Sequence, residues 1–141
     1  MKPKILYHGS SKKISLLVPR QPSKDLSNNS MKAVFATNVK DRALAMGLTK
    51  TKGSLSFRGN KKMNFVKGSP RMKHVYLHYL GSKSFKQNRP GEFISYIPVK
   101  PVKIEEYNVK NLSHLWRKSN MKELKEFLKN REKWRKENKQ K

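Results

Sequence analysis

Short apolar runs separated by polar, turn-rich segments make up most of this sequence. A run of a few residues rich in β-branched and aromatic side chains is typical of a strand, and Gly, Pro, Asn and Ser mark where such runs stop. The sequence therefore predicts strands at residues 4–8, 33–36, 75–80, 92–97 and 102–107, with one or two short strands inside 49–73. The polar segments 18–32 and 81–90 predict loops.

Helical patterns occur in the first half of the chain and at its C-terminal end. Thr37 or Asn38 predicts the N-cap of a helix that ends near Gly47. One side of this helix would carry Val39, Ala43 and Met46. A short helical turn is predicted at 10–17.

The C-terminal segment has the strongest helical pattern. Asn120 followed by Glu123 is a capping-box-like pair that predicts where the helix begins. Apolar residues then recur at helical spacing, with Lys and Arg on the other face. These apolar residues are Met121, Leu124, Phe127, Leu128 and Trp134. A shorter helical turn precedes this helix, around Leu112, Leu115 and Trp116.

Strands mixed with a few peripheral helices indicate the α+β class, and 141 residues fit one domain with a modest core. We expect a single domain over 1–141, with a core at 4–107 and a basic helical extension at 111–141.

Charge adds the clearest hint of a partner. The chain has 34 Lys and Arg against 9 Asp and Glu, a formal net charge of +25. Such an excess repels itself, so a polyanionic partner is expected, with nucleic acid or a nucleoprotein ahead of an acidic protein. A lysine-rich composition that serves solubility is the remaining alternative.

Several classes are excluded or disfavoured by composition. The chain has no cysteine, which excludes a disulfide framework, a cysteine zinc site and a thiol nucleophile. No apolar run approaches the roughly 18 residues of a membrane span, and the first residues do not resemble a signal peptide. We expect a cytoplasmic protein without a membrane or metal, compatible with a monomer. His74 and His78 are expected to be structural or surface residues.

Three polar or aromatic residues stand at or beside predicted strands. His8 lies where a strand meets a Gly9 turn, Phe35 lies in the short middle strand, and Glu92 opens a strand after Pro90-Gly91. A His can hold a ribose hydroxyl, an aromatic ring can stack on a heterocycle, and a carboxylate can stabilise charge as an N-glycosidic bond breaks. Taken singly, each residue also fits a turn, a core or a local salt bridge.

The order of three segments resembles the ADP-ribosyltransferase superfamily, in its diphtheria-toxin-like and poly(ADP-ribose)-polymerase-like branch with a His-Tyr-Glu signature. Leu6-Tyr7-His8-Gly9-Ser10 is similar to the first motif, and Val34-Phe35-Ala36-Thr37 with Lys40 and Ala43 to the second. Gly91-Glu92-Phe93-Ile94-Ser95-Tyr96, followed by residues 103–107, is similar to the third. The stacking tyrosine of the second motif aligns with Val34, or with Phe35 after a shift of one residue.

The resemblance implies a small split β-sheet that binds NAD as a substrate. His8 would hold the adenosine-side ribose, Gly9 would grip the nicotinamide amide, and Tyr7 or Phe35 would pack the ring, with Ser10 in the same motif. Glu92 would be catalytic together with His8. The loop 82–90 would face the acceptor through Lys83, Lys86 and Arg89, which suit an anionic acceptor.

Three functions follow as alternatives. The first is NAD-dependent mono-ADP-ribosylation of a nucleic acid or a nucleic-acid-associated protein, in a toxin, phage effector or host-modifying factor. The second is a non-catalytic, basic module on the same fold that binds nucleic acid or ribosomes. The third is a tRNA-phosphotransferase-like enzyme, whose additional Arg and His positions find no counterpart here.

Overall fold

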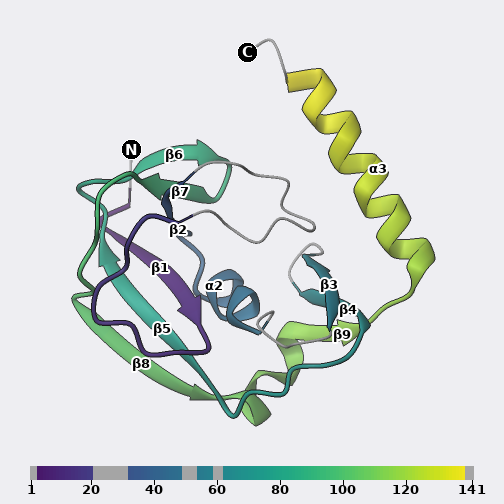
Figure 1. Ribbon diagram of the computed structural model, residues 1–141, viewed down its shortest axis with the longest axis horizontal. Coiled ribbons are helices and arrows are strands. Elements are labelled where there is room, and N and C mark those ends of the chain that lie inside the picture. The colour runs from purple at the N-terminus through teal and green to yellow at the C-terminus, as the bar shows by residue number, and fades with distance from the viewer. Residues whose placement is uncertain (1–2, 21–31, 49–53, 59–61, 139–141) are drawn as a thin grey trace.

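The computed structural model describes residues 3–20, 32–48, 54–58 and 62–138. Nine strands, two longer helices and a 3₁₀ segment are formed by these residues (Figure 1). In chain order they are β1 (Ile5–Ser10), β2 (Val34–Ala36), α2 (Lys40–Gly47), β3 (Leu55–Arg58), β4 (Met63–Lys67), β5 (His74–Gly81), β6 (Lys86–Arg89), β7 (Glu92–Ser95), β8 (Lys103–Asn108), η1 (Val109–Leu115), β9 (Trp116–Lys118) and α3 (Met121–Asn138). The α+β class is confirmed.

The strands form three small sheets with the orders β1-β5-β8, β2-β7-β6 and β3-β4-β9. All pairings are antiparallel except β4 with β9, which run parallel. The antiparallel bridge Tyr7↔Thr37 joins the first two sheets. Among the described residues, this single bridged pair links β1 to the end of β2.

The first sheet has an apolar core on each face. One cluster packs α2, η1 and β4 against β5, and includes Leu48, Phe65 and Leu77. The second contains Leu6 and Leu80 from the other face, packed against β2, β7 and Phe85. Period-2 alternation along β1 and β5 supplies residues to both clusters.

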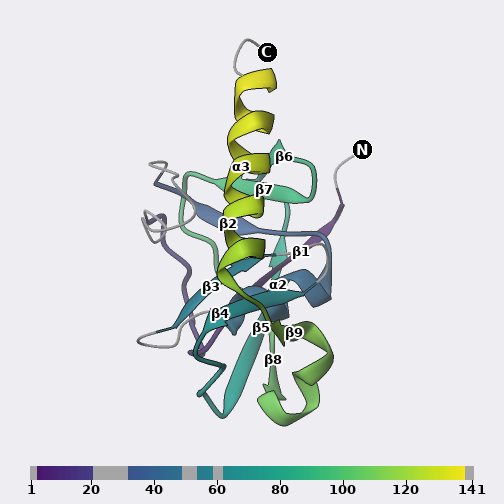
Figure 2. The ribbon, with the colours of Figure 1, turned by 90° about the vertical axis from the view of Figure 1, so that its right-hand side faces the viewer.

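Helix α3 lies along one side of the molecule, and its C-terminal turns extend beyond the sheets in both views (Figures 1 and 2). Its first turns are anchored, because Leu124 is buried and the Phe127 ring lies 5.0 Å from that of Phe57. The Glu123 N–H donates to the Asn120 side-chain oxygen at 2.9 Å, so the predicted N-cap is confirmed.

Several local predictions were wrong. Residues 11–17 form bends and a bridge from Leu17 to Val99 instead of a helical turn. Helix α2 is capped at Val39 without a side-chain hydrogen bond, and Val39 and Met46 are exposed. The segment 81–90 contains strand β6, which pairs with β7. The short helical turn predicted around Leu112 and Leu115 is confirmed as η1, and both residues are in the first core cluster.

Candidate functional site

The Tyr7–Thr37 bridge brings the three predicted motifs side by side. Tyr7 N–H donates to Thr37 O at 2.7 Å, and Thr37 N–H donates to Tyr7 O at 2.9 Å. Thr37 directly follows Ala36, which pairs with Phe93 of β7. One further step of that register sets Glu92 opposite Thr37. Since neighbouring strands are about 4.8 Å apart, the backbones of Tyr7 and Glu92 are separated by about 10 Å.

Backbone alternation gives Gly9 its orientation. Because Tyr7 uses its N–H and C=O for Thr37, these groups point away from β5. Hydrogen-bonded and non-hydrogen-bonded pairs alternate along an antiparallel ladder, so Gly9, two residues on, has the same orientation. The N–H and C=O of Gly9 therefore face away from β5. A strand edge with one donor and one acceptor is what a carboxamide requires.

The need for glycine at position 9 comes from helix α2. A Cβ built on Gly9 would lie 1.8 Å from the carbonyl oxygen of Ala43 and 2.6 Å from its carbonyl carbon. The backbones of β1 and α2 are in direct contact at this point. Because Gly9 has no side chain, helix α2 of the second motif can pack directly on strand β1 of the first motif.

The imidazole of His8 is oriented by the middle strand. Its Nδ1 donates to the carbonyl oxygen of Phe35 at 2.7 Å. In the neutral ring, this assignment makes Nε2 the hydrogen-bond acceptor. An accepting Nε2 is suited to a ribose hydroxyl.

Phe35 and Glu92 share one face of the second sheet. Val34, Ala36 and Phe93 belong to the second core cluster. Alternation places Phe35, and by continuation Glu92, on the opposite face. The sequence left Val34 and Phe35 as alternatives for the stacking position. Val34 is a core residue, whereas Phe35 lies on the same face as the carboxylate of Glu92.

The carboxylate of Glu92 is held by its own hairpin. The β6–β7 turn is Pro90-Gly91, and Gly91 has a φ of 77°, as the third position of a type II turn requires. The register shift between Gln87 and Arg89 marks a bulge at Asn88. Asn88 Nδ2 donates to Glu92 Oε1 at 2.7 Å, and Arg89 Nε lies 3.9 Å from the same oxygen.

Arg42 of α2 is a neighbour of this turn that the sequence prediction did not include. Its Nη1 would be 2.0 Å from a Cβ at Gly91, so the guanidinium packs over the turn before Glu92. Arg42 lies between Lys40 and Ala43 of the second motif. The sequence signal that could have identified Arg42 is a cation in the first turns of this helix, together with a Gly directly before the candidate carboxylate.

The remaining predicted site residues lie in different surroundings. Ser10 is buried and its hydroxyl accepts from Lys12 N–H at 3.1 Å, which gives it a role in the turn after β1. Lys83 precedes β6 and is exposed. Lys86 and Arg89 lie on β6, with Lys86 Nζ 5.0 Å from the Tyr96 ring centre and the Arg89 guanidinium 5.8 Å from that of Trp134.

His78 lies behind His8 and is fully buried. Its Nδ1–H donates to His8 O at 3.0 Å, and its Nε2 accepts from Ile14 N–H at 2.9 Å. A backbone N–H can only donate, so the ring is the neutral Nδ1–H tautomer. Burial lowers the pKa of His78, and its structural role was predicted correctly.

A second polar cluster surrounds Tyr79 on the face of the first sheet that carries α2. Tyr79 and Tyr107 donate to Glu105 Oε1, and the hydrogen bond from Tyr79 is the main cause that lowers the pKa of this carboxyl. Lys40 Nζ lies 5.2 Å from the Tyr79 ring centre and 5.8 Å from that of Tyr7. Hydrogen bonding to Tyr79 raises the pKa of Lys40. The cluster fastens the start of α2 to the sheet, beside Tyr7.

Comparison with models of protein families, with curated proteins and with solved structures gave no match. Within the described ranges, no group of three or more His, Asp or Glu side chains is placed to hold a metal ion. No helix among the described residues is long and apolar enough to cross a membrane. The arrangement around the Tyr7–Thr37 bridge therefore carries the functional argument.

Proposed function

We propose that this protein is an NAD-dependent mono-ADP-ribosyltransferase with a split-sheet ADP-ribosyltransferase-like core. The observation that supports the proposal is the Tyr7–Thr37 bridge, which sets the edge of Gly9, the ring of Phe35 and the carboxylate of Glu92 on neighbouring strands. These are the residues that the resemblance assigns to the carboxamide, the nicotinamide ring and the reacting ribose.

Each residue would act through a feature of its position. Gly9 would pair its outward N–H and C=O with the carboxamide of NAD, and His8 Nε2 would accept from a ribose hydroxyl. Phe35 would stack on the nicotinamide ring. Glu92 would accept a hydrogen bond from the ribose 2′-hydroxyl and stabilise the positive charge that develops at C1′.

The transfer exchanges one bond to C1′ for another. The bond between C1′ and the nicotinamide nitrogen breaks, and its electron pair leaves with nicotinamide. A nucleophile of the acceptor forms the new bond to C1′ and releases its proton to solvent. Asn88 holds Glu92 through a hydrogen bond at 2.7 Å, which keeps the carboxylate oriented during this exchange.

The first experiment is incubation of the protein with labelled NAD and a cell lysate, with nicotinamide release and label transfer as readouts. Glu92→Gln should lower both by at least about a hundredfold, because the charge opposite C1′ is lost. Its stability should change little, since a partly exposed ion pair contributes only about 1 kcal/mol or less. Glu132→Gln removes a comparable exposed ion pair on α3 and should leave transfer unchanged.

Equal transfer by the wild type and Glu92→Gln would contradict the proposed role of the carboxylate. Neither transfer nor nicotinamide release from the wild type, together with salt-sensitive nucleic-acid binding, would support the non-catalytic module instead. The charge of +25 is the observation that favours that second candidate.

A further inference from the structure

The β6–β7 hairpin presents two cation–aromatic pairs on its exposed side. Lys86 Nζ lies 5.0 Å from the ring centre of Tyr96, and the Arg89 guanidinium lies 5.8 Å from that of Trp134. Tyr96 directly follows β7, whereas Trp134 comes from α3. Two segments far apart in the sequence thus meet at the strand that flanks Glu92.

Both rings are exposed. Tyr96 is 52% exposed and Trp134 is 44% exposed. Edge strands such as β6 commonly carry charge that prevents pairing with another chain. That role explains Lys86 and Arg89, but it does not explain two large rings left accessible beside them.

Exposed aromatic rings alternating with cations are the means by which proteins bind single-stranded nucleic acid. The rings stack on bases, and the cations contact phosphates. Because of the bulge at Asn88, Lys86 and Arg89 lie opposite Ile94 and Glu92, which are two residues apart, a separation of about 7 Å along the strand. The hairpin segment carries Lys83, Lys86 and Arg89 against Glu92 as its one acidic side chain.

We propose that Tyr96, Trp134, Lys86 and Arg89 form a binding surface for a single-stranded polynucleotide. Arg89 contacts both Trp134 and Glu92, so the bound strand passes next to the candidate carboxylate. A single-stranded polynucleotide would be the acceptor class of the proposed function. Only the ADP-ribosylation of the bound strand rests on that proposed function. Binding itself requires no NAD.

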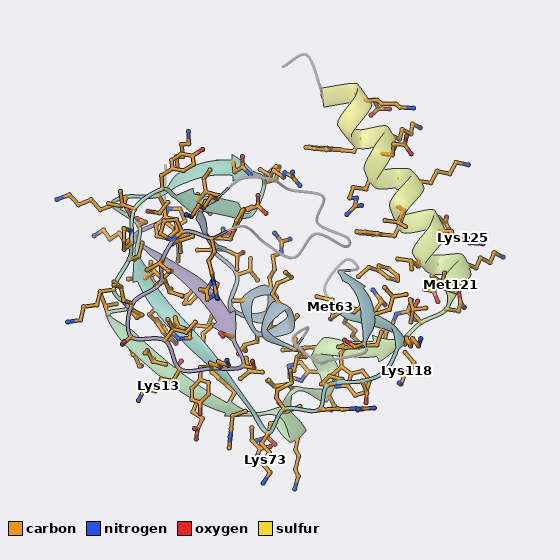
Figure 3. All side chains as sticks on the ribbon, viewed as in Figure 1. Lys13, Met63, Lys73, Lys118, Met121 and Lys125 are labelled. Atoms are coloured by element: carbon orange, nitrogen blue, oxygen red, sulfur yellow. The ribbon has the colours of Figure 1, made fainter. Side chains whose placement is uncertain are left out.

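Side chains throughout the described part of the molecule are drawn in Figure 3, where Lys73 lies at the end of the molecule away from β6. That end also contains η1 in both ribbon views (Figures 1 and 2). Lys73 and Lys110 are exposed there and serve as charge-matched controls for Lys86. Val102, 68% exposed, is the control for loss of an exposed apolar side chain.

The test is fluorescence polarisation of a labelled single-stranded 12-mer, measured without NAD and at several salt concentrations. Tyr96→Ala and Trp134→Ala should each weaken binding by about tenfold, and Lys86→Gln should also reduce the salt dependence. Val102→Ala, Lys73→Gln and Lys110→Gln should bind nearly as the wild type does. The same 12-mer as a duplex should bind more weakly, because its bases cannot stack on protein rings.

A direct readout comes from the tryptophan itself. The chain has two tryptophans, so Trp116→Phe leaves Trp134 as the reporter. Base stacking should quench its fluorescence as the 12-mer is added. No quenching, binding unaffected by Tyr96→Ala, or equally tight binding of duplex or polyglutamate would overturn the inference. Because these measurements omit NAD, absence of ADP-ribosyl transfer would leave their outcome unchanged.

Discussion

At the scale of single residues, His78 is the side chain whose protonation state the fold defines most clearly. Its ring is fully buried between His8 and Ile14, and both ring nitrogens are used by backbone groups. Protonation would remove the acceptor for Ile14 N–H and place a charge in an apolar core. Burial of the ring disfavours its charged form and therefore lowers the pKa of His78.

The pH dependence of stability follows from this shift. The unfolded chain binds a proton at His78 near pH 6.5, whereas the folded chain binds it only at lower pH. The contribution of the neutral His78 ring to the free energy of unfolding is therefore complete above pH 6.5, and it is lost as the pH falls through the pKa of His78 in the folded protein. Thermal unfolding between pH 7.5 and 5.5 should show this loss.

The control for this prediction is a pair of histidine variants. His78→Asn should be less stable at pH 7.5 but should depend less on pH across the same range. His114→Gln changes an exposed histidine and should retain the wild-type pH dependence. Parallel curves for the wild type and His78→Asn would contradict the assignment.

Site residues could be predicted only where a short motif carried them. The segment Tyr7-His8-Gly9 predicted a strand correctly, but the turn expected at Gly9 was wrong, because β1 continues through Gly9, which pairs with Leu77, to Ser10. Arg42 was missed because it reaches the turn before Glu92 through a tertiary contact, and Asn88 was missed although it binds Glu92 within the same hairpin. Asn88 depends on a bulge, which local residue preferences do not specify.

At the scale of elements, the contact between α2 and β1 is the tightest backbone packing near the site. Gly9→Ala would put a methyl group 1.8 Å from the Ala43 carbonyl oxygen, so the helix must move. We expect a loss of about 2 kcal/mol or more in the free energy of unfolding, as for overpacked cores. Urea unfolding measures this change.

Gly81→Ala is the matched control, since a Cβ there meets nothing within 4 Å and Gly81 also lies in a strand. This variant should be neutral or slightly more stable, because alanine restricts the unfolded chain. Equal stability of the two variants would show that α2 does not pack on Gly9 as described.

The elements that the sequence predicted well are those with a short run of apolar and aromatic residues. β5 and β7 contain such runs, and both were placed within a few residues. β6 was taken as a loop because Lys86-Gln87-Asn88-Arg89 has no apolar residue, and only its pairing with β7 makes it a strand. In α2 the small residues Ala43, Ala45 and Gly47 are buried, whereas Met46 is exposed, so apolar character alone does not mark the buried side of this helix.

At the scale of the whole molecule, the charge of +25 must weaken the fold by self-repulsion. Salt shortens the screening length from about 10 Å at 0.1 M to about 3 Å at 1 M. Raising NaCl across this range should therefore increase the melting temperature by about 3–5 °C, equivalent to about 1 kcal/mol. Scanning calorimetry measures the shift.

A variant with five exposed lysines changed to glutamine should show a smaller rise with salt. Suitable positions, spread over the described surface, are Lys4, Lys12, Lys73, Lys110 and Lys125. A melting temperature that falls with added NaCl in the wild type would mean that attractive ion pairs outweigh repulsion.

The parallel pairing of β9 with β4 has a consequence for how the protein is made. Met63 pairs with Trp116, roughly fifty positions later in the sequence, and contacts of such range are slow to form. Leu112 and Leu115, in the first core cluster, leave the ribosome at about the same time as β9. A growing chain that has reached β8 lacks η1, which packs on α2, and β9, which pairs with β4. During synthesis, the first core cluster therefore stays incomplete until η1 and β9 have emerged.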